Sequence, residues 1–384
     1  MLDLYLGKTE ETKLTLLFIF AISIYFIVLM KFTNSIYYYK DIHINEDYNP
    51  NVSIIISARN EEKNIKKTLD SLIEQNYPND KYEILVANDR STDSTQSILY
   101  YYKKKFKNIK ILNIDKTPIG WSNKKWALNE LINISNSDII LQIDADCIAP
   151  ISWIKTMSAH FIDDKVGFVC GSSPLIHNDP ILNKIFQMES LIQESINAGS
   201  ILNNMTVSCT GRNLAFRKKY FKQVDGYSGN EDVPSGDDDL LLQKISIESN
   251  CKIKYSINSN SLVNSFAPKN FSEFIRQRLR FSSKAILYYK LNTTIELKAI
   301  SILIYLSNVV FLSSLILVIN FNLYFLLIPI LMKIFSDFMI SITFLLKVKR
   351  EWSLKTFLIL TLIHPFYIVL FGFLGPLVQV DWKK

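Results

Sequence analysis

Cysteine and histidine are scarce in this sequence, since the 384-residue chain holds only four of each. The four cysteines lie far apart, no two of them form a Cys-x-x-Cys pair, and no histidine stands near them. This spacing argues against a zinc site and a disulfide framework, and it favours a reducing compartment. The chain also lacks a basic tract long enough to indicate nucleic-acid binding, although its formal net charge is +7.

Hydrophobic residues are abundant by contrast, at 48% of the chain with a mean hydropathy of +0.13. An uncharged run at 14–30 predicts an uncleaved membrane anchor within residues 1–35, because no basic leader or small-residue cleavage site flanks it. Within a C-terminal membrane region, 297–384, three more apolar stretches predict further spans at 299–320, 322–346 and 355–378. One of the four spans is alternatively a re-entrant segment.

The basic loop between the last two stretches, KVKREWSLK at 347–355, predicts the orientation of the chain. Because basic loops stay in the cytoplasm, the segment between the membrane regions is expected there too, with the N-terminus outside. Lys383 and Lys384 at the other end of the last stretch weakly oppose this orientation.

Two charged residues, Lys333 and Asp337, stand one helical turn apart inside the third predicted span. Charges in a membrane helix face the bundle interior and are often functional. They form either a self-neutralising pair within one helix or a site that handles a lipid or a sugar chain.

The middle of the chain alternates strand-length apolar runs with amphipathic stretches. The runs are found at 52–57, 82–87, 109–114 and 138–143, and the helices are expected at 61–75, from about 92, and near 124–134. Strands that alternate with helices predict parallel βαβ units, and continuously apolar strands predict a sheet that is covered on both faces. We therefore expect an α/β domain, with a mostly parallel Rossmann-like sheet, over residues 50–270.

Polar clusters follow three of the predicted strands: ARNEE at 58–62, NDRSTDST at 88–95 and DADC at 144–147. The carboxyl ends of parallel strands share one edge of the sheet, where ligands bind in open α/β folds. Capping of a helix N-terminus by Ser91, Thr92 and Asp93 is an alternative explanation of the second cluster.

Two carboxylates, Asp144 and Asp146, flank Ala145 at the end of the fourth strand. Their mutual repulsion must be neutralised, and oxygen ligands favour Mg²⁺ or Mn²⁺. Such a metal commonly completes its coordination with phosphate oxygens, and it stabilises a departing diphosphate. The pattern therefore predicts a metal-bound nucleoside diphosphate.

The ordered set of motifs resembles the family 2 glycosyltransferases with a GT-A fold. The segments that carry the resemblance are VSIIISARNEE, EILVANDRSTDST, NKKWALN, IDADC, GRNLAFRKKYFKQVDGY, SGDDDLLL and RQRLRF. The flanking apolar stretches resemble those of integral-membrane members. The resemblance implies transfer of a sugar from a nucleotide donor, usually a UDP-sugar, with inversion at the anomeric carbon.

The resemblance also implies roles for residues at the three strand ends. Asp89 would contact the nucleobase, although Asn88 stands where many relatives carry a second acid. Lys124 would lie near the nucleotide, with the adjacent Lys125 as the alternative. The remaining donor-side residues implied are Arg59 and Glu61 in the nucleobase pocket, Asp144 at the ribose or the metal, and Asp146 at the metal.

The segment SGDDDLLL resembles the family's E-D-x-D-L pattern, whose first Asp accepts the proton of the acceptor hydroxyl. Alignment on the final Asp-Leu makes Asp237 the catalytic base, with Gly236 in place of the preceding acid and Asp238 as the rival. Alternatively, the three acids only cap the helix that begins there, where negative charge is favourable.

The segment RQRLRF resembles the Q-x-x-R-W motif of membrane-bound members, with Phe281 in place of Trp. Gln277, Arg278, Arg280 and Phe281 would then lie at the diphosphate and the acceptor, within an amphipathic interfacial region at 271–296. A basic helix attracted to anionic lipid explains the same residues.

Together these features predict an integral-membrane, metal-dependent, inverting glycosyltransferase at the cytoplasmic face of the cell membrane. A lipid-linked or polysaccharide acceptor is expected, and four spans favour single-sugar transfer over processive polysaccharide synthesis. A GT-A-like nucleotidyltransferase and a catalytically inactive membrane scaffold are the alternatives.

Overall fold

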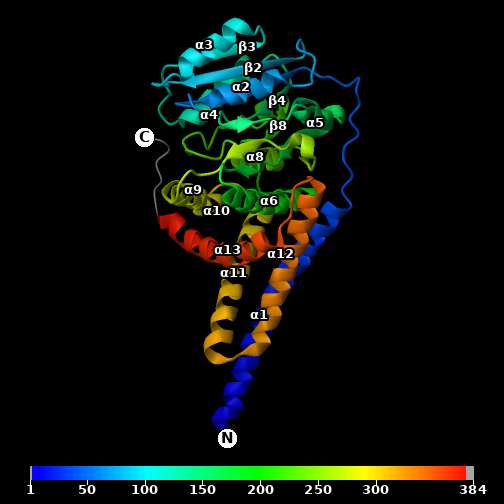
Figure 1. The fold of residues 1–384 in the computed structure, drawn as a ribbon, viewed down its shortest axis with the longest axis vertical. Coiled ribbons are helices and arrows are strands. Elements are labelled where there is room, and N and C mark those ends of the chain that lie inside the picture. The colour runs from blue at the N-terminus through cyan, green and yellow to red at the C-terminus, as the bar shows by residue number, and fades with distance from the viewer. Residues whose placement is uncertain (1, 378–384) are drawn as a thin grey trace. The chain divides into compact units, whose positions relative to one another are not determined.

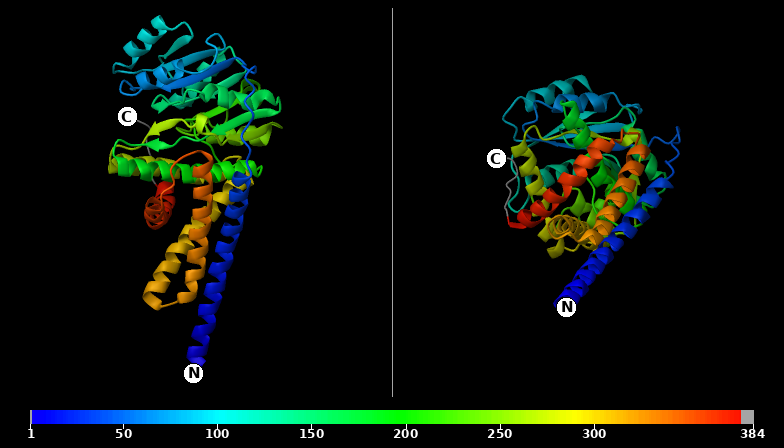
Figure 2. Two further views of the ribbon diagram at one scale, coloured as in Figure 1. Left: turned by 45° about the vertical axis from the view of Figure 1, so that its right-hand side comes forward. Right: turned by 60° about the horizontal axis from the view of Figure 1, so that its bottom comes forward.

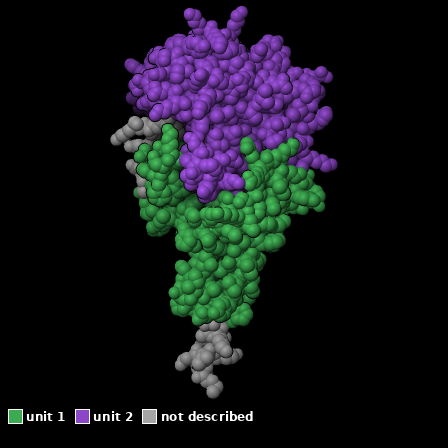
Figure 3. All heavy atoms as spheres, viewed as in Figure 1, with its two compact units in different colours: residues 1–38, 268–291, 295–380 green, residues 39–267, 292–294, 381–384 purple. Residues whose placement is uncertain are grey.

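The computed structural model describes residues 2–377. Met1 and residues 378–384, which include the last residue of the predicted third C-terminal stretch together with Lys383 and Lys384, lie outside that range. The chain folds into two compact units, coloured separately in Figure 3. Among the described residues, the first unit comprises 2–38, 268–291 and 295–377 and holds the long apolar helices, and the second is built mainly from residues 39–267.

The second unit is an α/β domain around a seven-stranded sheet with the order β3-β2-β1-β4-β8-β6-β9 (Figure 1). Strands β1 to β4 are parallel to one another, and β8 runs antiparallel to both β4 and β6. The strands are β1 Val52–Ala58, β2 Tyr82–Asp89, β3 Ile109–Ile114, β4 Ile139–Gln142, β6 Val166–Gly171, β8 Leu214–Arg217 and β9 Lys252–Ser256. This mostly parallel α/β sheet confirms the predicted fold class.

The central strands form for the reason that the sequence indicates. Every residue of β2 is buried, and β1 is buried except for one partly exposed serine. Continuous runs of Ile, Val and Leu suit strands that helices cover on both faces. The helices of this unit are α2 Ile65–Ile73, α3 Thr95–Lys105, α4 Asn123–Ile134, α5 Trp153–Ala159, α6 Pro180–Leu202, α7 Lys218–Gln223 and α8 Asp239–Glu248.

Helix α2 begins later than the sequence predicts. Its buried face, Ile65, Thr68, Leu69 and Leu72, has the expected helical spacing, but residues 61–64 precede the helix instead of belonging to it. Asn60 adopts a left-handed conformation with φ of 55°, which turns the chain sharply after β1. The delayed start leaves the polar residues 59–62 in a loop at the sheet edge.

A small three-stranded sheet lies beside the carboxyl end of β4. Its order is β5-β10-β7, with β5 Cys147–Ile148, β7 Leu175–Ile176 and β10 Asn264–Phe266. Because β5 starts directly after Asp146, the pairing of β5 with β10 fixes the direction in which the chain leaves the acidic turn.

The first unit consists of helices α1 Leu2–Tyr37, α9 Phe271–Ser283, α10 Ala285–Lys290, α11 Ile295–Phe321, α12 Leu327–Lys347 and α13 Leu354–Leu374. Four segments are long and apolar enough to cross a membrane, at Thr12–Tyr37, Ile295–Phe321, Tyr324–Lys347 and Leu354–Leu374. They coincide with the four stretches that the sequence singles out.

The charged pair inside α12 is neutralised by two helices together. Lys333 Nζ lies 2.6 Å from Asp337 Oδ2, and the hydroxyl of Tyr25 on α1 donates to Asp337 Oδ1 at 2.6 Å. The Lys333 ammonium also faces the rings of Tyr25 and Phe311 at 5.3 and 5.6 Å from their centroids. Every charge therefore has partners, which agrees with the self-neutralising interpretation and adds a link between α1 and α12.

A buried histidine makes the stability of the α/β unit depend on pH. Burial, assisted by the charge of Lys254, lowers the pKa of His160 to about 4, whereas an unfolded chain has a histidine pKa of about 6.5. Below pH 6.5 the unfolded state binds a proton that the folded state rejects, so stability falls as the pH drops towards 4.

We expect His160→Gln to remove this dependence. Between pH 7 and pH 5 the histidine should cost the native protein about 2 kcal/mol, and the variant should lose that part of the slope. Unfolding of the detergent-purified protein, followed at both pH values for native and variant chains, measures the difference. Equal pH slopes for the two chains would contradict this assignment.

Candidate active site

The carboxyl ends of β1 and β2 bring a buried acid and two arginines together. Asp89, the last residue of β2, is only 3% exposed. Its Oδ1 accepts from Arg90 Nε at 2.8 Å, and its Oδ2 lies 3.8 Å from Arg59 Nη1. The two arginines offset the charge of the Asp89 carboxylate and fix its orientation.

The loops after these two strands are joined by reciprocal hydrogen bonds. Asn60 Oδ1 accepts from the amide of Thr92 at 2.8 Å, and a carboxylate oxygen of Glu62 accepts from the amide of Ser94 at 3.0 Å. In return, Asp93 accepts from the amides of Glu62 and Thr95. The capping role expected at 91–93 therefore falls to Asp93, and it serves both loops.

Glu61 is the remaining predicted residue of this corner. Its amide donates to Thr95 Oγ1 at 2.8 Å, and its carboxylate accepts from Asn64 at 3.0 Å. It thus belongs to the same pair of loops as Arg59 and Asp89.

The acidic turn after β4 presents two carboxylates outwards. Ala145 is 4% exposed, and its carbonyl oxygen accepts from Thr68 Oγ1 of α2 at 2.8 Å. The two acids on either side of it, Asp144 and Asp146, are both partly exposed. An inward alanine held by α2 therefore separates two acids whose side chains are partly open to solvent.

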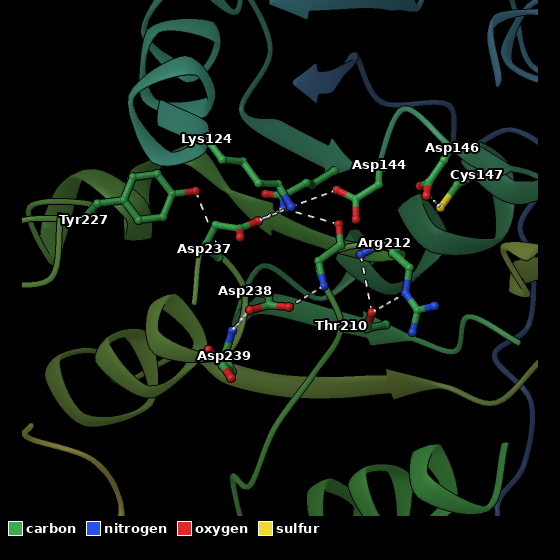
Figure 4. A network of polar contacts seen from close by, with 12 residues as sticks. Lys124, Asp144, Asp146, Cys147, Thr210, Arg212, Tyr227, Asp237, Asp238 and Asp239 are labelled. Atoms are coloured by element: carbon green, nitrogen blue, oxygen red, sulfur yellow. Dashed lines mark hydrogen bonds and ion pairs between the residues drawn. The ribbon is translucent and has the colours of Figure 1, made fainter. Parts of the chain in front are cut away.

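A single lysine joins the acidic turn to the acid-rich segment at 237–239. Lys124 Nζ lies 2.9 Å from Asp144 Oδ1 and 3.0 Å from Asp237 Oδ2, as Figure 4 shows. The next residue, Lys125, is buried instead and donates to the carbonyl and side-chain oxygens of Asn230. Of the two candidate lysines, the structure thus brings Lys124 to the acids and gives Lys125 a structural role.

One ammonium shared by two carboxylates shifts the pKa values of the group. Burial alone lowers the pKa of Lys124, but Asp144 and Asp237 outweigh it and raise the pKa, so the lysine stays charged. Burial raises the pKa of Asp237, and the nearby charges of Asp238 and Asp144 add to the rise against the opposing effect of Lys124. A carboxylate with a raised pKa is better suited to accept a proton near neutral pH.

Asp237 is held from two further directions. Gln142, the last residue of β4, donates its side-chain amide to Asp237 Oδ2 at 2.8 Å. The same side-chain nitrogen of Gln142 also donates to the carbonyl oxygen of Gly211 at 3.3 Å. A Cβ at Gly211 would stand 3.1 Å from Asp237 Oδ2 and 3.2 Å from Gln142 Nε2, so glycine permits this close approach.

The two acids that follow Asp237 bond to the backbone. Asp238 accepts from the amide of Gly211 at 2.7 Å and from the amide of Asp239 at 2.7 Å, and it is the N-cap of α8. Asp239 accepts from the amide of Leu240 at 2.8 Å. The capping alternative therefore describes Asp238 and Asp239, whereas the side chain of Asp237 faces Lys124 and Gln142.

The backbone conformation at Gly236 explains why glycine stands here in place of the acid of the family pattern. Its φ of 85° lies in the left-handed region, and a Cβ there would stand 2.6 Å from a side-chain carbon of Leu240. The chain needs glycine at this position to turn into α8.

By itself, the acidic turn provides only some of the ligands that a divalent cation needs. Among the described residues, no group of three or more His, Cys, Asp and Glu could hold a metal ion. Mg²⁺ is commonly bound through one or two carboxylates together with substrate phosphates and water, and Asp144 and Asp146 match that pattern. Lys124 contacts Asp144, and the thiol of Cys147 lies 3.6 Å from Asp146 Oδ1, so both candidate ligands already have a contact in this structure.

The four residues predicted for the diphosphate and acceptor lie on α9, in the other unit. Arg278 is 7% exposed, and its guanidinium faces the rings of Phe274 and Tyr367. Phe281 is exposed and lies under the guanidinium of Arg280. Gln277 shares this helix, and its side-chain oxygen has no hydrogen-bond partner among the described residues.

Sequence reasoning missed three residues of the site. Arg90 stands inside the NDRSTDST motif but was not assigned a contact with Asp89. Gln142 was counted only as part of a buried strand. The hydroxyl of Tyr227 donates to the carbonyl oxygen of Asp237 at 3.5 Å, a contact that its sequence segment does not indicate.

Comparison with known proteins relates this chain to glycosyltransferases. Residues 53–225 match the family model "Glycosyl transferase family 2". A probable glycosyltransferase YdaM of Bacillus subtilis is 30% identical over 186 residues, which covers 46% of this chain and 43% of that protein. A beta-monoglucosyldiacylglycerol synthase of Nostoc is 34% identical over 120 residues, which is 31% of this chain and 25% of that one. The chain thus matches less than half the length of these relatives.

A solved structure shares the fold across nearly the whole chain. The mannosyltransferase PcManGT of Pyrobaculum calidifontis, in complex with GDP-Man and Mn²⁺, superposes with a TM-score of 0.59 at 16% identity. The match covers 95% of this chain and 97% of that one.

Proposed function

We propose that this chain, whose residues 53–225 match the family model of the family 2 glycosyltransferases, moves one sugar from a nucleoside-diphosphate donor to a lipid-linked or polysaccharide acceptor. A UDP-sugar is the expected donor, and the reaction inverts the anomeric carbon at the cytoplasmic face of the membrane. The observation that carries this proposal is the position of Lys124, which contacts both Asp144 of the acidic turn and the buried Asp237.

The donor would occupy the edge formed by β1, β2 and β4. Asp89, clamped by Arg59 and Arg90, would accept a hydrogen bond from the nucleobase, and Glu61 lines the same corner. Asp144 and Lys124 would face the ribose and the diphosphate. Asp146, with Asp144, would hold Mg²⁺ or Mn²⁺, which when bound offsets the negative charge that develops on the departing diphosphate.

Asp237 would act as the general base. The proton of the acceptor hydroxyl passes to its carboxylate while the acceptor oxygen forms a bond to the anomeric carbon. The bond between that carbon and the diphosphate oxygen breaks, and its electron pair leaves with the nucleoside diphosphate. Attack from the side opposite the leaving group inverts the configuration, and it needs no covalent intermediate with the protein.

The acceptor is proposed from the membrane helices and from the relatives. A beta-monoglucosyldiacylglycerol synthase and poly(ribitol-phosphate) glycosyltransferases are among the similar proteins, and their names specify lipid and polymer acceptors. Gln277, Arg278, Arg280 and Phe281 on α9 would contact the diphosphate or the acceptor. The small number of membrane helices favours single-sugar transfer over export of a long chain.

A donor screen tests the proposal directly. The detergent-purified chain is incubated with individual UDP- and GDP-sugars, with Mn²⁺, Mg²⁺ or EDTA, and release of the nucleoside diphosphate is measured. We expect one donor to be hydrolysed slowly in a metal-dependent way, and NMR of the transferred sugar with a lipid acceptor to show inversion. Release of pyrophosphate would instead indicate a nucleotidyltransferase, and a ladder of products would indicate processive synthesis.

A further inference from the structure

Helix α13 exposes an unbroken apolar ridge along its whole length. Large hydrophobic side chains recur every three or four residues on one face and are all well exposed: Leu354, Leu358, Leu362, Phe366, Leu370, Phe373 and Leu377, of which the last belongs to the turn that follows the helix. The opposite face packs against the other helices of the unit through Phe357, Leu360 and Phe371. One side of α13 is thus built for protein contact and the other for an apolar medium.

The direction of α13 differs from that of the helices beside it. Figures 1 and 2 show α13 running across α11 and α12, while α1, α11 and α12 run alongside one another. Near its start, Phe357 contacts Phe338, which lies nine residues before the end of α12. Near its end, Gly372 lies against Tyr305, which is ten residues after the start of α11.

These two contacts lie at the same level of the α11–α12 hairpin. Because α11 and α12 run in opposite directions from a short connection, similar distances from that connection mark one height: Tyr305 lies sixteen residues before the end of α11, and Phe338 lies fourteen residues after the start of the Tyr324–Lys347 span. Phe357 and Gly372 are separated by about 22 Å along α13. If α13 ran parallel to α11 and α12, its contacts at Phe357 and Gly372 would fall at heights about 22 Å apart along the hairpin. Because both contacts lie at one height, α13 runs across the hairpin.

Helix α9 lies alongside α13 at this height, and its charged residues indicate the depth of this part of the protein in a membrane. Phe274 contacts Tyr367, and Ser282 contacts Gly375, so eight residues on one helix match eight on the other. Helix α9 and the residue after it carry Arg276, Gln277, Arg278, Arg280 and Lys284. A helix with these cations is stable at the membrane surface, whereas burying it in the hydrocarbon region costs free energy. Because α13 runs beside α9, it should lie at the same depth.

We propose that α13 does not cross the membrane but lies in the plane of one leaflet, with its apolar ridge in the acyl chains. The cations of α9 would face the anionic headgroups of the same leaflet. Three crossings, by α1, α11 and α12, then remain. The C-terminus returns to the side of the basic loop at 347–355, which brings Lys383 and Lys384 into agreement with the positive-inside rule.

Labelling of single added cysteines in the full chain tests this topology. Asn320→Cys reports the far end of α11, Lys349→Cys reports the basic loop, and a cysteine appended after Lys384 reports the C-terminus. Intact cells are treated with a membrane-impermeant maleimide before and after permeabilisation, and the unaltered chain gives the background from its own cysteines. We expect the appended cysteine to react in the same condition as the one at 349, and the cysteine at 320 in the opposite one.

The outcome separates this proposal from the proposed orientation of the enzyme. If the cysteine at 349 and the appended one both react from outside, the in-plane helix stands and the cytoplasmic orientation is wrong. If the appended cysteine reacts together with the one at 320, α13 crosses the membrane and the proposal is overturned.

A depth measurement gives an independent test. Nitroxide labels at Leu362→Cys, in the middle of α13, and Phe373→Cys, near its end, are eleven residues apart on the exposed ridge, and power saturation in vesicles reports the distance of each label from the nearest membrane surface. An in-plane helix places them at nearly the same depth, whereas a crossing helix places the first near the bilayer centre and the second about 16 Å closer to the surface. The matched pair Phe335→Cys and Leu346→Cys, equally spaced and exposed on α12, should show the large separation. A large separation in both pairs would overturn the proposal.

Discussion

Replacing Asp237 with asparagine is expected to lower the rate of sugar transfer by about 10²- to 10⁴-fold, because the general base is lost. The amide keeps the size of the side chain and one oxygen that can accept from Gln142. Donor binding should change little, since the nucleobase and metal residues are untouched. The measurement is kcat and KM for transfer, together with donor affinity by calorimetry.

Asp238→Asn is the matched control. Both oxygens of Asp238 accept from backbone amides, so this change removes an acceptor from the start of α8 or from Gly211. We expect a loss of about 1–2 kcal/mol of stability, as for other helix caps, with a rate within about tenfold of the native enzyme. If Asp238→Asn instead abolishes transfer while Asp237→Asn retains it, the base is Asp238.

Removing the carboxylate of Asp146 is expected to weaken metal binding and to lower the rate of catalysis. A bound metal contributes several kcal/mol to stabilising the leaving diphosphate, and each 1.36 kcal/mol is a factor of ten in rate. Asp146→Ala should therefore lose about 10²-fold or more in rate, and half-maximal activity should require more Mn²⁺. A Mn²⁺ titration of donor hydrolysis in native and variant enzymes measures both effects.

Asp232→Ala provides the control for this prediction, because Asp232 is an exposed acid of the same unit. Its loss removes one negative charge but should change neither the rate nor the Mn²⁺ requirement. An Asp146→Ala enzyme with unchanged activity and an unchanged Mn²⁺ titration would remove the acidic turn from the mechanism.

The sheet and its ligand-binding edge were open to prediction because their causes are local. The predicted runs at 52–57 and 82–87 are largely apolar, as expected for strands buried on both faces, and their alternation with helices indicates that they are parallel. Parallel strands bring their carboxyl ends to one edge, so Asp89 and Asp144 could be assigned to one site without knowledge of their contacts.

The connections inside the site could not be predicted in the same way. Gln142 reaches Asp237 across 95 residues of sequence, and nothing near Gln142 distinguishes it from other strand residues. Whether Lys124 or Lys125 meets the acids depends on the rotation of α4, which two adjacent lysines do not reveal. The direction of α13 was equally hidden, because a crossing helix and an in-plane helix of this composition have the same length and apolarity.

The hydrogen bonds between the loops at 58–62 and 89–95 have a consequence for how the donor is recognised. Because Asn60, Glu62 and Asp93 tie the two loops to each other, the corner that we propose binds the nucleobase is formed when the protein folds. Little ordering entropy remains to be lost when a nucleotide arrives, so preorganisation supports its affinity. Discrimination between a uracil and a guanine nucleotide then depends on the shape of a rigid corner.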